Sequence, residues 1–248
     1  MTAIELSPTV IRGGGRPDTY KNVNGKRVVS VTTITGRYDN KESLIVWAAR
    51  ETREGRDYNI TRDHAAATGT AVHAAIEDFV CYGGLGEPTF DELETDEQKH
   101  QANLAFRSFV EWYGSACPII THAETPLVNE RLQVAGTVDA VGYLNGKRTL
   151  LDWKTSNGIY PGHIVQVAAY GTLWSEAFTA DYIEQYAVLR FGKDGTRHEH
   201  AWTAEEMAKP AALFEKWLES YRLDSEVQKL LRKRTKSETK EGNHVQES

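Results

Sequence analysis

The sequence predicts one α/β domain in which helices flank a mixed β-sheet. Helix-like segments come first, followed by several strand-like segments, a helix, two more strands and a last helix, an order typical of such a sheet. A hydrophobic content of 40% and a charged content of 26% over 248 residues fit a globular chain. We find no internal repeat or linker, so residues 1–231 are expected to form a single domain.

The amino-terminal part combines an irregular arm with helices. The arm at residues 1–27 contains three adjacent glycines and two prolines, which disfavour regular structure. β-Branched residues dominate residues 28–35 and predict a short strand. Asp39 or Asn40 can cap the first helix, and a capping-box sequence at residues 95–98 opens the third. The three helices are expected at residues 40–53, 61–80 and 96–113.

The carboxyl-terminal part alternates strands and helices. Hydrophobic and β-branched runs bounded by turn residues predict the strands, and a second capping box at residues 203–206 predicts the last helix. That helix is expected to end near Leu231, and the charged residues 232–248 are expected to form a disordered tail. The strands are expected at residues 119–127, 137–141, 148–153, 183–191 and 196–202, and the intervening helix at residues 163–178.

One predicted hairpin organises the functional prediction. Asn145-Gly146 is the strongest short-range signal for a two-residue β-turn, and this turn sets the register of the two strands beside it. Counting back pair by pair places Asp139 opposite Asp152, with the two Cβ atoms about 5 Å apart on one face. Lys154 follows Asp152 by two residues and therefore shares that face.

The two facing carboxylates of this hairpin repel each other unless a cation lies between them. The pattern therefore indicates a divalent-metal site with Lys154 beside it. Leu150, Asp152 and Lys154 share one face, and Leu151 and Trp153 share the other, which indicates a strand covered on both sides. Two alternatives stay open: charged residues on a solvated face, or a register slip by one residue that moves Asp152 to the other face.

Composition excludes several classes of protein. Cys81 and Cys117 cannot supply a disulfide framework or a four-cysteine iron–sulfur cluster. No signal-peptide pattern and no apolar run of about 18 residues is present, so neither secretion nor a membrane span is expected. The net charge of −6 and the pI of about 5.8 exclude binding to DNA by bulk charge, so local cations must grip any nucleic acid. The candidates are Arg12, Arg16, Lys21, Lys26 and Arg27 in the arm and Arg232, Lys233 and Arg234 in the tail.

Four short blocks occur in a fixed order along the chain. They are Gly69-Thr70-Ala71-Val72-His73, Gly136-Thr137-Val138-Asp139, Leu150-Leu151-Asp152-Trp153-Lys154-Thr155-Ser156 and Gln166-Val167-Ala168-Ala169-Tyr170. Together they resemble the RecB-like branch of the PD-(D/E)XK nuclease superfamily. The run at residues 28–35 also resembles the lead-in of phage-type exonucleases, and the two cysteines point to relatives without an iron–sulfur cluster.

The resemblance implies a role for each matching residue. The matches to the metal ligands are His73, Asp139, Asp152 and the backbone carbonyl of Trp153. The matches to the catalytic lysine and to the helix motif beside the substrate are Lys154, Gln166 and Tyr170. Glu77 lies one turn after His73 and is either a residue that orients the imidazole or a solvated acid.

The resemblance further implies a restriction-endonuclease-like core and the activity of a metal-dependent DNA exonuclease. The expected cofactor is Mg²⁺ or Mn²⁺, because carboxylates with one imidazole suit these ions. The expected partners are DNA with a free end and a single-strand-annealing or other recombination protein. The expected setting is DNA recombination, repair or degradation in the cytoplasm of a bacterium or a phage-infected host. The alternatives are a structure-specific or restriction-type endonuclease and a nuclease-like module that binds DNA without cutting it.

Overall fold

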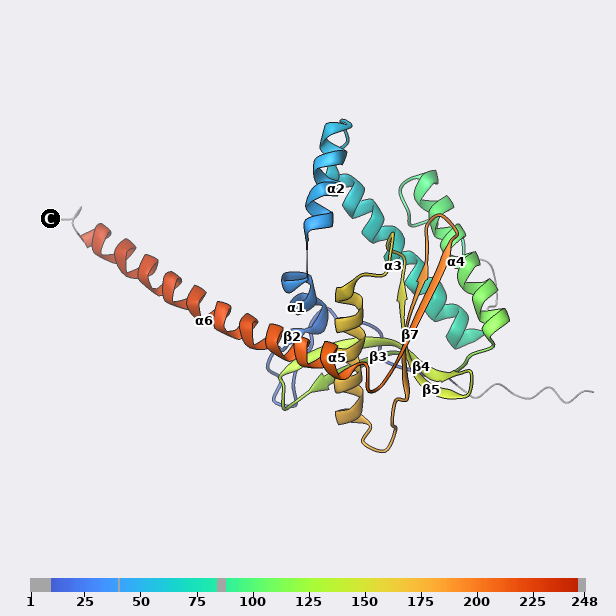
Figure 1. Ribbon diagram of the computed structural model, residues 1–248. Helices are drawn as coiled ribbons and strands as arrows, with labels where there is room; N and C mark the ends of the chain where they lie inside the picture. Colours follow the sequence, from blue (N-terminus) through green and yellow to red (C-terminus); the bar gives the residue numbers. More distant parts are fainter. Residues whose placement is uncertain (1–9, 40, 84–87, 245–248) are drawn as a thin grey trace, which may run out of the picture.

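The computed structural model describes residues 10–39, 41–83 and 88–244. Across these residues, six helices flank one mixed sheet of seven strands, which confirms the predicted α/β class (Figure 1). The strands are β1 (Ile11–Arg12), β2 (Val29–Ser30), β3 (Ile119–Asn129), β4 (Val134–Leu144), β5 (Lys147–Lys154), β6 (Gln185–Phe191) and β7 (Arg197–Thr203). The helices are α1 (Val31–Tyr38), α2 (Glu42–Arg53), α3 (Tyr58–Tyr82), α4 (Asp96–Ala116), α5 (Pro161–Ala177) and α6 (Ala208–His244).

The sheet has the strand order β1-β3-β4-β5-β6-β7, and β2 pairs with β4 beside this path. β3, β4 and β5 form an antiparallel meander, whereas β6 runs parallel to β5. Parallel neighbours need a crossover connection, and α5 supplies it between β5 and β6. α5 begins shortly after β5 ends, and Lys154 at the carboxyl end of β5 donates to Gln166 in the first turns of α5.

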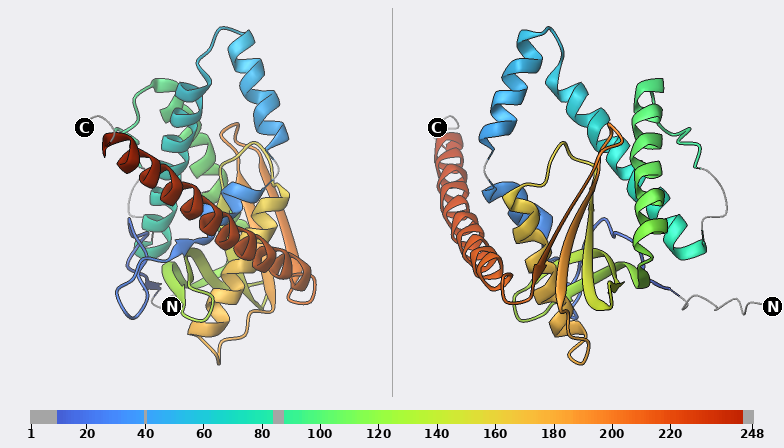
Figure 2. Two further views of the ribbon diagram at one scale, coloured as in Figure 1. Left: turned by 90° about the vertical axis from the view of Figure 1, so that its left-hand side faces the viewer. Right: turned by 45° about the vertical axis from the view of Figure 1, so that its right-hand side comes forward.

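Two hydrophobic cores lie on opposite faces of the sheet. α3 and α4 cover one face, and α1, α5 and α6 cover the other (Figure 2). Leu151 and Trp153 point into the first core and Leu150 into the second, which confirms the predicted two-sided burial of β5. The Trp153 ring lies 5.8 Å from Phe109 between ring centres, so this side chain is a core residue.

The central hairpin forms with the predicted turn. Asn145 and Gly146 have φ angles of 51° and 77°, a left-handed backbone that these two residues tolerate well. The predicted register is confirmed over five pairs: Leu144 with Lys147, Tyr143 with Arg148, Gly142 with Thr149, Val141 with Leu150 and Ala140 with Leu151.

The hairpin ladder ends one position before the expected carboxylate pair. Val138 packs into the core beside α5, and Ala140, two residues later, packs into the core beside α3. The side-to-side alternation of β4 is therefore broken at Asp139, and the predicted facing pair with Asp152 does not form. The Asp139 carboxylate instead accepts a hydrogen bond of 2.8 Å from the backbone nitrogen of Trp153.

The β-branched run at residues 28–35 is mostly helical, contrary to the strand prediction. Only its first part forms β2, and α1 begins at Val31 because Ser30 caps the helix by accepting a bond from the Thr33 nitrogen. Val31 and Ile34 are completely buried, so core packing outweighs the strand preference of these side chains. The first long helix, α2, is preceded by Lys41 rather than by the expected Asp39, and Asn40 lies outside the described residues.

The last helix is longer than expected. α6 continues to His244 instead of ending near Leu231, so helix occupies much of the segment that was expected to be a disordered tail. The hydrogen bonds of the capping box between Thr203 and Glu206 form, but in a turn before α6. Residues 1–9 of the arm and 245–248 of the tail lie outside the described residues. No described helix is both long and apolar enough to cross a membrane.

Candidate active site

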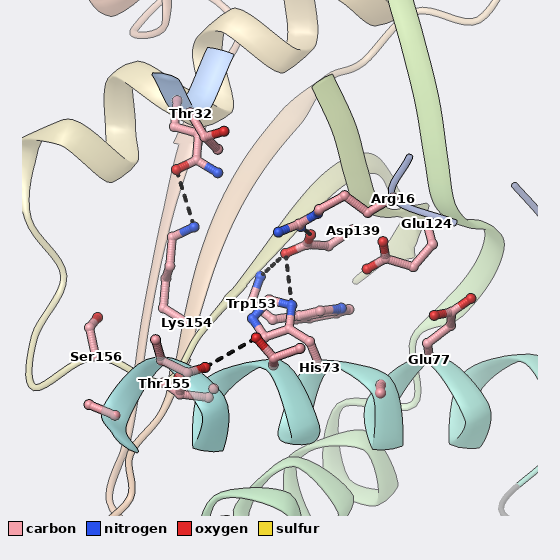
Figure 3. Close-up of a pocket in the computed structure, with 16 residues that line it drawn as sticks. Arg16, Thr32, His73, Glu77, Glu124, Asp139, Trp153, Lys154, Thr155 and Ser156 are labelled. Atoms are coloured by element: carbon pink, nitrogen blue, oxygen red, sulfur yellow. Dashed lines mark hydrogen bonds and ion pairs between the residues drawn. The ribbon is translucent and has the colours of Figure 1, made fainter. Parts of the chain in front are cut away.

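A cavity of about 450 Å³ opens between α3, the sheet and the amino-terminal end of α5. Figure 3 shows the side chains of His73, Glu124, Asp139 and Arg16 close together and Lys154 to one side of them. The residues that were singled out from the sequence and that line this cavity are Arg16, His73, Glu77, Asp139, Trp153, Lys154 and Gln166. All four sequence blocks and the amino-terminal arm therefore contribute residues to this cavity.

Three of these side chains form a group that could hold a metal ion. His73, Glu124 and Asp139 each offer one ligand atom, and these atoms all lie within 4.8 Å of one another. His73 Nδ1 lies 3.9 Å from Asp139 Oδ2 and is buried without a hydrogen-bond partner among the described residues. An unpaired buried nitrogen is unfavourable by about 1–3 kcal/mol. One imidazole with two carboxylates is a donor set that fits a divalent cation.

Glu124 is the member of this group that the sequence did not reveal. It lies in β3 with a φ of 43°, a left-handed backbone that is uncommon for a residue with a side chain. Its two neighbours pair with β4 on either side of Asp139, so the strands bring the two acids to matching positions. The sequence shows that Glu124 is an acid inside a predicted strand. Only the pairing of β3 with β4 shows that Glu124 lies beside Asp139.

Burial shifts the protonation of the whole group. It raises the pKa of Glu124 to about 8, and the charge of Asp139 adds to this effect. It raises the pKa of Asp152 to about 6 against the attraction of Lys154, and raises that of Asp139 against the same lysine. It lowers the pKa of His73 to about 4, with the charge of Lys154 adding to the effect. At neutral pH the imidazole is therefore uncharged and has a lone pair available for a ligand.

Lys154 is held by a hydrogen-bonded network on the α5 side of the sheet. Its Nζ lies 2.7 Å from Asp152 Oδ2 and donates to Gln166 Oε1 at 3.3 Å. The Gln166 amide nitrogen lies 3.2 Å from Asp152 Oδ1 and 3.0 Å from Tyr170 Oη, and it donates to both oxygens. Asp152 and Tyr170 are buried and do not line the cavity. In this structure Asp152 thus anchors the lysine and stands apart from the group around His73.

Two motif glycines allow these elements to approach. A Cβ at Gly136 would lie 2.6 Å from Tyr170 Cε1, and a Cβ at Gly69 would lie 2.8 Å from Thr155 Oγ1. Both distances are far below an ordinary van der Waals contact. Glycine at these positions therefore lets α5 pack on β4, and α3 pack on the segment after β5.

The amino-terminal arm brings a cation into the cavity. The Gly13 nitrogen donates to the Ala123 carbonyl at 2.8 Å, and a Cβ at Gly13 would lie only 2.1 Å from the Glu124 carbonyl oxygen. The arm can therefore run directly along β3. It places Arg16 Nη2 3.5 Å from Asp139 Oδ1. Of the arm cations that were expected to grip a phosphate, Arg16 is thus the one beside the candidate metal ligands.

Glu77 has a different partner from the one considered. Its carboxylate accepts a hydrogen bond of 2.6 Å from Arg12 Nε. The side chain is only 15% exposed, so it is not a freely solvated acid. The contact with His73 that would orient the imidazole does not form in this structure. Glu77 instead ties α3 to the arm at the edge of the cavity.

The end of β6 and the turn after it tie two walls of the cavity together. Buried Arg190 donates from Nε to the Ser156 carbonyl at 2.6 Å, and Lys193 Nζ donates to the Ala65 carbonyl at 2.7 Å. Ser156 and Ala65 both line the cavity. Sequence reasoning missed these contacts because their partners are 34 and 128 residues apart along the chain.

Comparisons with known proteins return solved structures of low similarity to this chain. No protein-family model and no curated protein matches this chain. A candidate exonuclease from Eubacterium rectale is 13% identical with a TM-score of 0.42, and the match covers 60% of this chain and 64% of that one. LHK-Exo in complex with dAMP is 13% identical with a TM-score of 0.40, over 84% of this chain and 94% of that one. The alkaline exonuclease LHK-Exo from Laribacter hongkongensis is 12% identical with a TM-score of 0.30, over 50% of this chain and 70% of that one.

These solved structures are described as exonucleases. The chain spans less than two thirds of the length of the Eubacterium rectale structure. Identities of 12–13% do not identify an activity, so the activity has to be argued from the chemistry of the cavity.

Proposed function

We propose that this chain is a metal-dependent DNA exonuclease of the RecB-like branch of the PD-(D/E)XK superfamily. One observation supports the proposal most strongly: a group able to hold a metal ion and a lysine share one cavity, although they come from four separate elements. Hydrolysis of a phosphodiester needs an activated water and neutralisation of charge on the phosphate. Carboxylates, an imidazole and a lysine are the side chains that supply these needs.

The proposed metal ligands are His73, Glu124 and Asp139, with Asp152 and the Trp153 carbonyl as further ligands from the family resemblance. Two observations favour a cation here: the unpaired Nδ1 of His73 and the crowding of carboxylates whose pKa values are raised by burial. Mg²⁺ or Mn²⁺, when bound, would lower the pKa of a water molecule and polarise a phosphate oxygen. A bound cation would also add positive charge beside these buried acids, which Arg16 and Lys154 face among the described residues.

The remaining roles belong to cations and to the groups that hold them. The ammonium of Lys154 would orient the attacking water or stabilise the negative charge that develops on the phosphate. Asp152 and Gln166 hold this ammonium at the edge of the cavity, and Tyr170 holds Gln166 in turn. Arg16 is suited to bind a phosphate oxygen, because its guanidinium is a fixed positive charge with several donors.

The proposed substrate is DNA with a free end, as in the phage-type exonucleases that the sequence blocks resemble. The proposed setting is recombination, repair or degradation of DNA in the cytoplasm, with a recombination protein as partner. These finer assignments rest on the resemblance of the blocks and of the run at residues 28–35. The proposal of phosphodiester cleavage is independent of these finer assignments, because it is argued from the residues of the cavity.

The test is digestion of end-labelled linear DNA and covalently closed circular DNA, each with Mg²⁺ or with EDTA. We expect loss of the linear DNA only with Mg²⁺ and little attack on the circles. Asp139→Ala and Asp152→Ala should abolish cleavage while the circular dichroism spectrum stays that of a folded protein. Efficient nicking of the circles would indicate an endonuclease. DNA binding without any cleavage would indicate a non-catalytic module, and full activity in either variant would reject the site.

A further inference from the structure

Arg190 is a buried cation near the end of β6 that the proposed chemistry does not use. It is 3% exposed, and its guanidinium donates to oxygen atoms on separate segments of the chain. Nε donates to the Ser156 carbonyl at 2.6 Å, Nη1 to Thr196 Oγ1 at 2.6 Å and Nη2 to Asp194 Oδ1 at 3.3 Å. Ser156 follows Lys154 by two residues, whereas the other two acceptors belong to the turn after β6. The guanidinium therefore joins the segment after β5 to that turn.

Arg190 and Lys154 are neighbours in the sheet. They form the last pair of the parallel ladder between β5 and β6, where adjacent strands lie about 4.8 Å apart. Val188, two residues before Arg190, packs into the core beside α5, so the Arg190 side chain starts on the same face as Lys154. The two cations then turn in different directions, because the ammonium bonds to Asp152 and the guanidinium bonds to Ser156.

The segment between Lys154 and α5 is held from both sides. Residues 155–160 form neither helix nor strand. Thr155 packs on α3, where a Cβ at Gly69 would lie 2.8 Å from Thr155 Oγ1. Arg190 fastens the next residue, Ser156, to β6. Figure 3 shows Lys154 and Ser156 on one side of the cavity. The backbone directly after the lysine is thus fixed between α3 and Arg190.

The turn after β6 also contacts the opposite wall of the cavity. Lys193 Nζ donates to the Ala65 carbonyl of α3 at 2.7 Å, and Figure 2 shows this turn beside α3. The same helix carries His73 about two turns later. A Cβ at Gly192 would lie 2.5 Å from Arg190 Nη2, so glycine leaves the space that the guanidinium occupies. One turn therefore contacts both the wall with the proposed catalytic lysine and the wall with the candidate metal ligand.

Stability alone is a poor explanation for a buried arginine at this position. Among the described residues, the acid within ion-pair distance of its guanidinium is Asp194, which is 3.3 Å away and whose side chain is 60% exposed. Removing a charge from water is unfavourable, and a buried ion pair is weak evidence for stability. Arginine supplies a rigid planar group with several donors in fixed directions, which an apolar side chain cannot supply. Those directions are what fix the segment after β5.

We propose that Arg190 is a positioning residue that sets the place of the Lys154 ammonium in the cavity. By holding the Ser156 carbonyl, it fixes the backbone from which the lysine side chain reaches Asp152 and Gln166. Moving a catalytic group by about 1 Å can lower a rate by about a hundredfold. The proposal rests on the proposed function for the role of Lys154, but the hydrogen bonding of the ammonium can be measured without any cleavage.

The first measurement is ¹⁵N NMR of the lysine ammonium groups in the full-length chain, with Lys154→Arg used to assign the Lys154 signal. Hydrogen bonds to Asp152 and Gln166 should protect this ammonium from exchange with water and make its signal visible. Arg190→Gln should broaden or abolish the signal. Arg197→Gln, the same change at an exposed position of β7 beside the same turn, should leave the signal as in wild type.

The second measurement is DNA cleavage with Mg²⁺. Arg190→Gln should lower kcat by about tenfold to a hundredfold with little change in KM. Its affinity for Mn²⁺ in calorimetry should equal that of wild type, because the group around His73 is unchanged. Arg190→Lys keeps the charge without the planar fork, so its kcat should lie between those of wild type and Arg190→Gln. It replaces Arg190→Gln if circular dichroism shows that the latter does not fold.

An unchanged Lys154 signal or an unchanged kcat in these variants overturns the proposal, and so does a wild type without a protected Lys154 signal. An effect confined to KM also overturns it, because Arg190 would then serve DNA binding. Loss of the fold in both variants would assign Arg190 to stability instead. If wild type cuts no DNA, the proposed function fails, and the NMR comparison still decides whether Arg190 positions the ammonium.

Discussion

Replacing Glu124 by glutamine should stabilise the metal-free protein, and the effect should grow with pH. Burial and the nearby charge of Asp139 raise the pKa of Glu124 from 4.5 to about 8 in the folded protein. A carboxyl group with a raised pKa favours its protonated form in the folded state. The folded state therefore loses stability as pH rises from the unfolded pKa to the folded one, and the loss is complete above about pH 8.

The size of the effect follows from the same two values. The interval from 4.5 to about 8, at 1.36 kcal/mol per pKa unit, corresponds to at most about 5 kcal/mol of unfolding free energy. Glutamine has nearly the same shape and does not ionise. The variant and the wild type should therefore have similar stability below pH 4.5, and the variant should be more stable by several kcal/mol above pH 8.

The assay is urea unfolding in EDTA across this pH range. Glu111→Gln, at an exposed position of α4, is the matched control and should differ from wild type by an amount that does not change with pH. Added Mn²⁺ should stabilise wild type more than Glu124→Gln, since an amide oxygen is a weaker ligand than a carboxylate. A stability difference independent of pH would refute the buried-acid reasoning. Equal stabilisation of both proteins by Mn²⁺ would remove Glu124 from the proposed ligands.

Three further predictions address other parts of the site. Lys154→Ala should keep its affinity for Mn²⁺ in calorimetry but lose cleavage, whereas His73→Ala should weaken Mn²⁺ binding by about tenfold or more; the reverse pattern would show that the two roles are misassigned. Gly136→Ala should destabilise the fold by about 1–3 kcal/mol in urea unfolding, because the new Cβ would lie 2.6 Å from the Tyr170 ring; unchanged stability would disprove this close packing. Arg16→Ala should lower the salt dependence of DNA binding by about one unit of slope, and an unchanged slope would exclude Arg16 as a phosphate contact.

The parts of the central hairpin that the sequence predicted correctly depend on short-range patterns. The Asn145-Gly146 turn needs only two residues with a left-handed backbone, and it sets the register of the whole β4–β5 hairpin. Strand periodicity then places Trp153 in the core and Lys154 on the opposite face. The family resemblance of the blocks added His73 and Gln166, which share the cavity with Lys154 in the structure.

The departures from prediction arise where distant segments meet. The β-branched run became α1 because Val31 and Ile34 are buried against the sheet, and core burial outweighs the modest strand preference of these residues. Asp139 lost its place opposite Asp152 because β4 changes the side it presents to the two cores at that position. Neither outcome can be read from the spacing of nearby residues.

By itself, the sequence determined the α/β class and the central turn, and it predicted the residue types of a candidate metal site. Only the tertiary structure decided that Glu124 and Arg16 join His73 and Asp139, and that Asp152 anchors Lys154. The physical reason is the range of the interactions involved. Turns and periodicity act over a few residues, whereas Arg16 meets Asp139 across 123 residues of chain and only because the arm runs along β3.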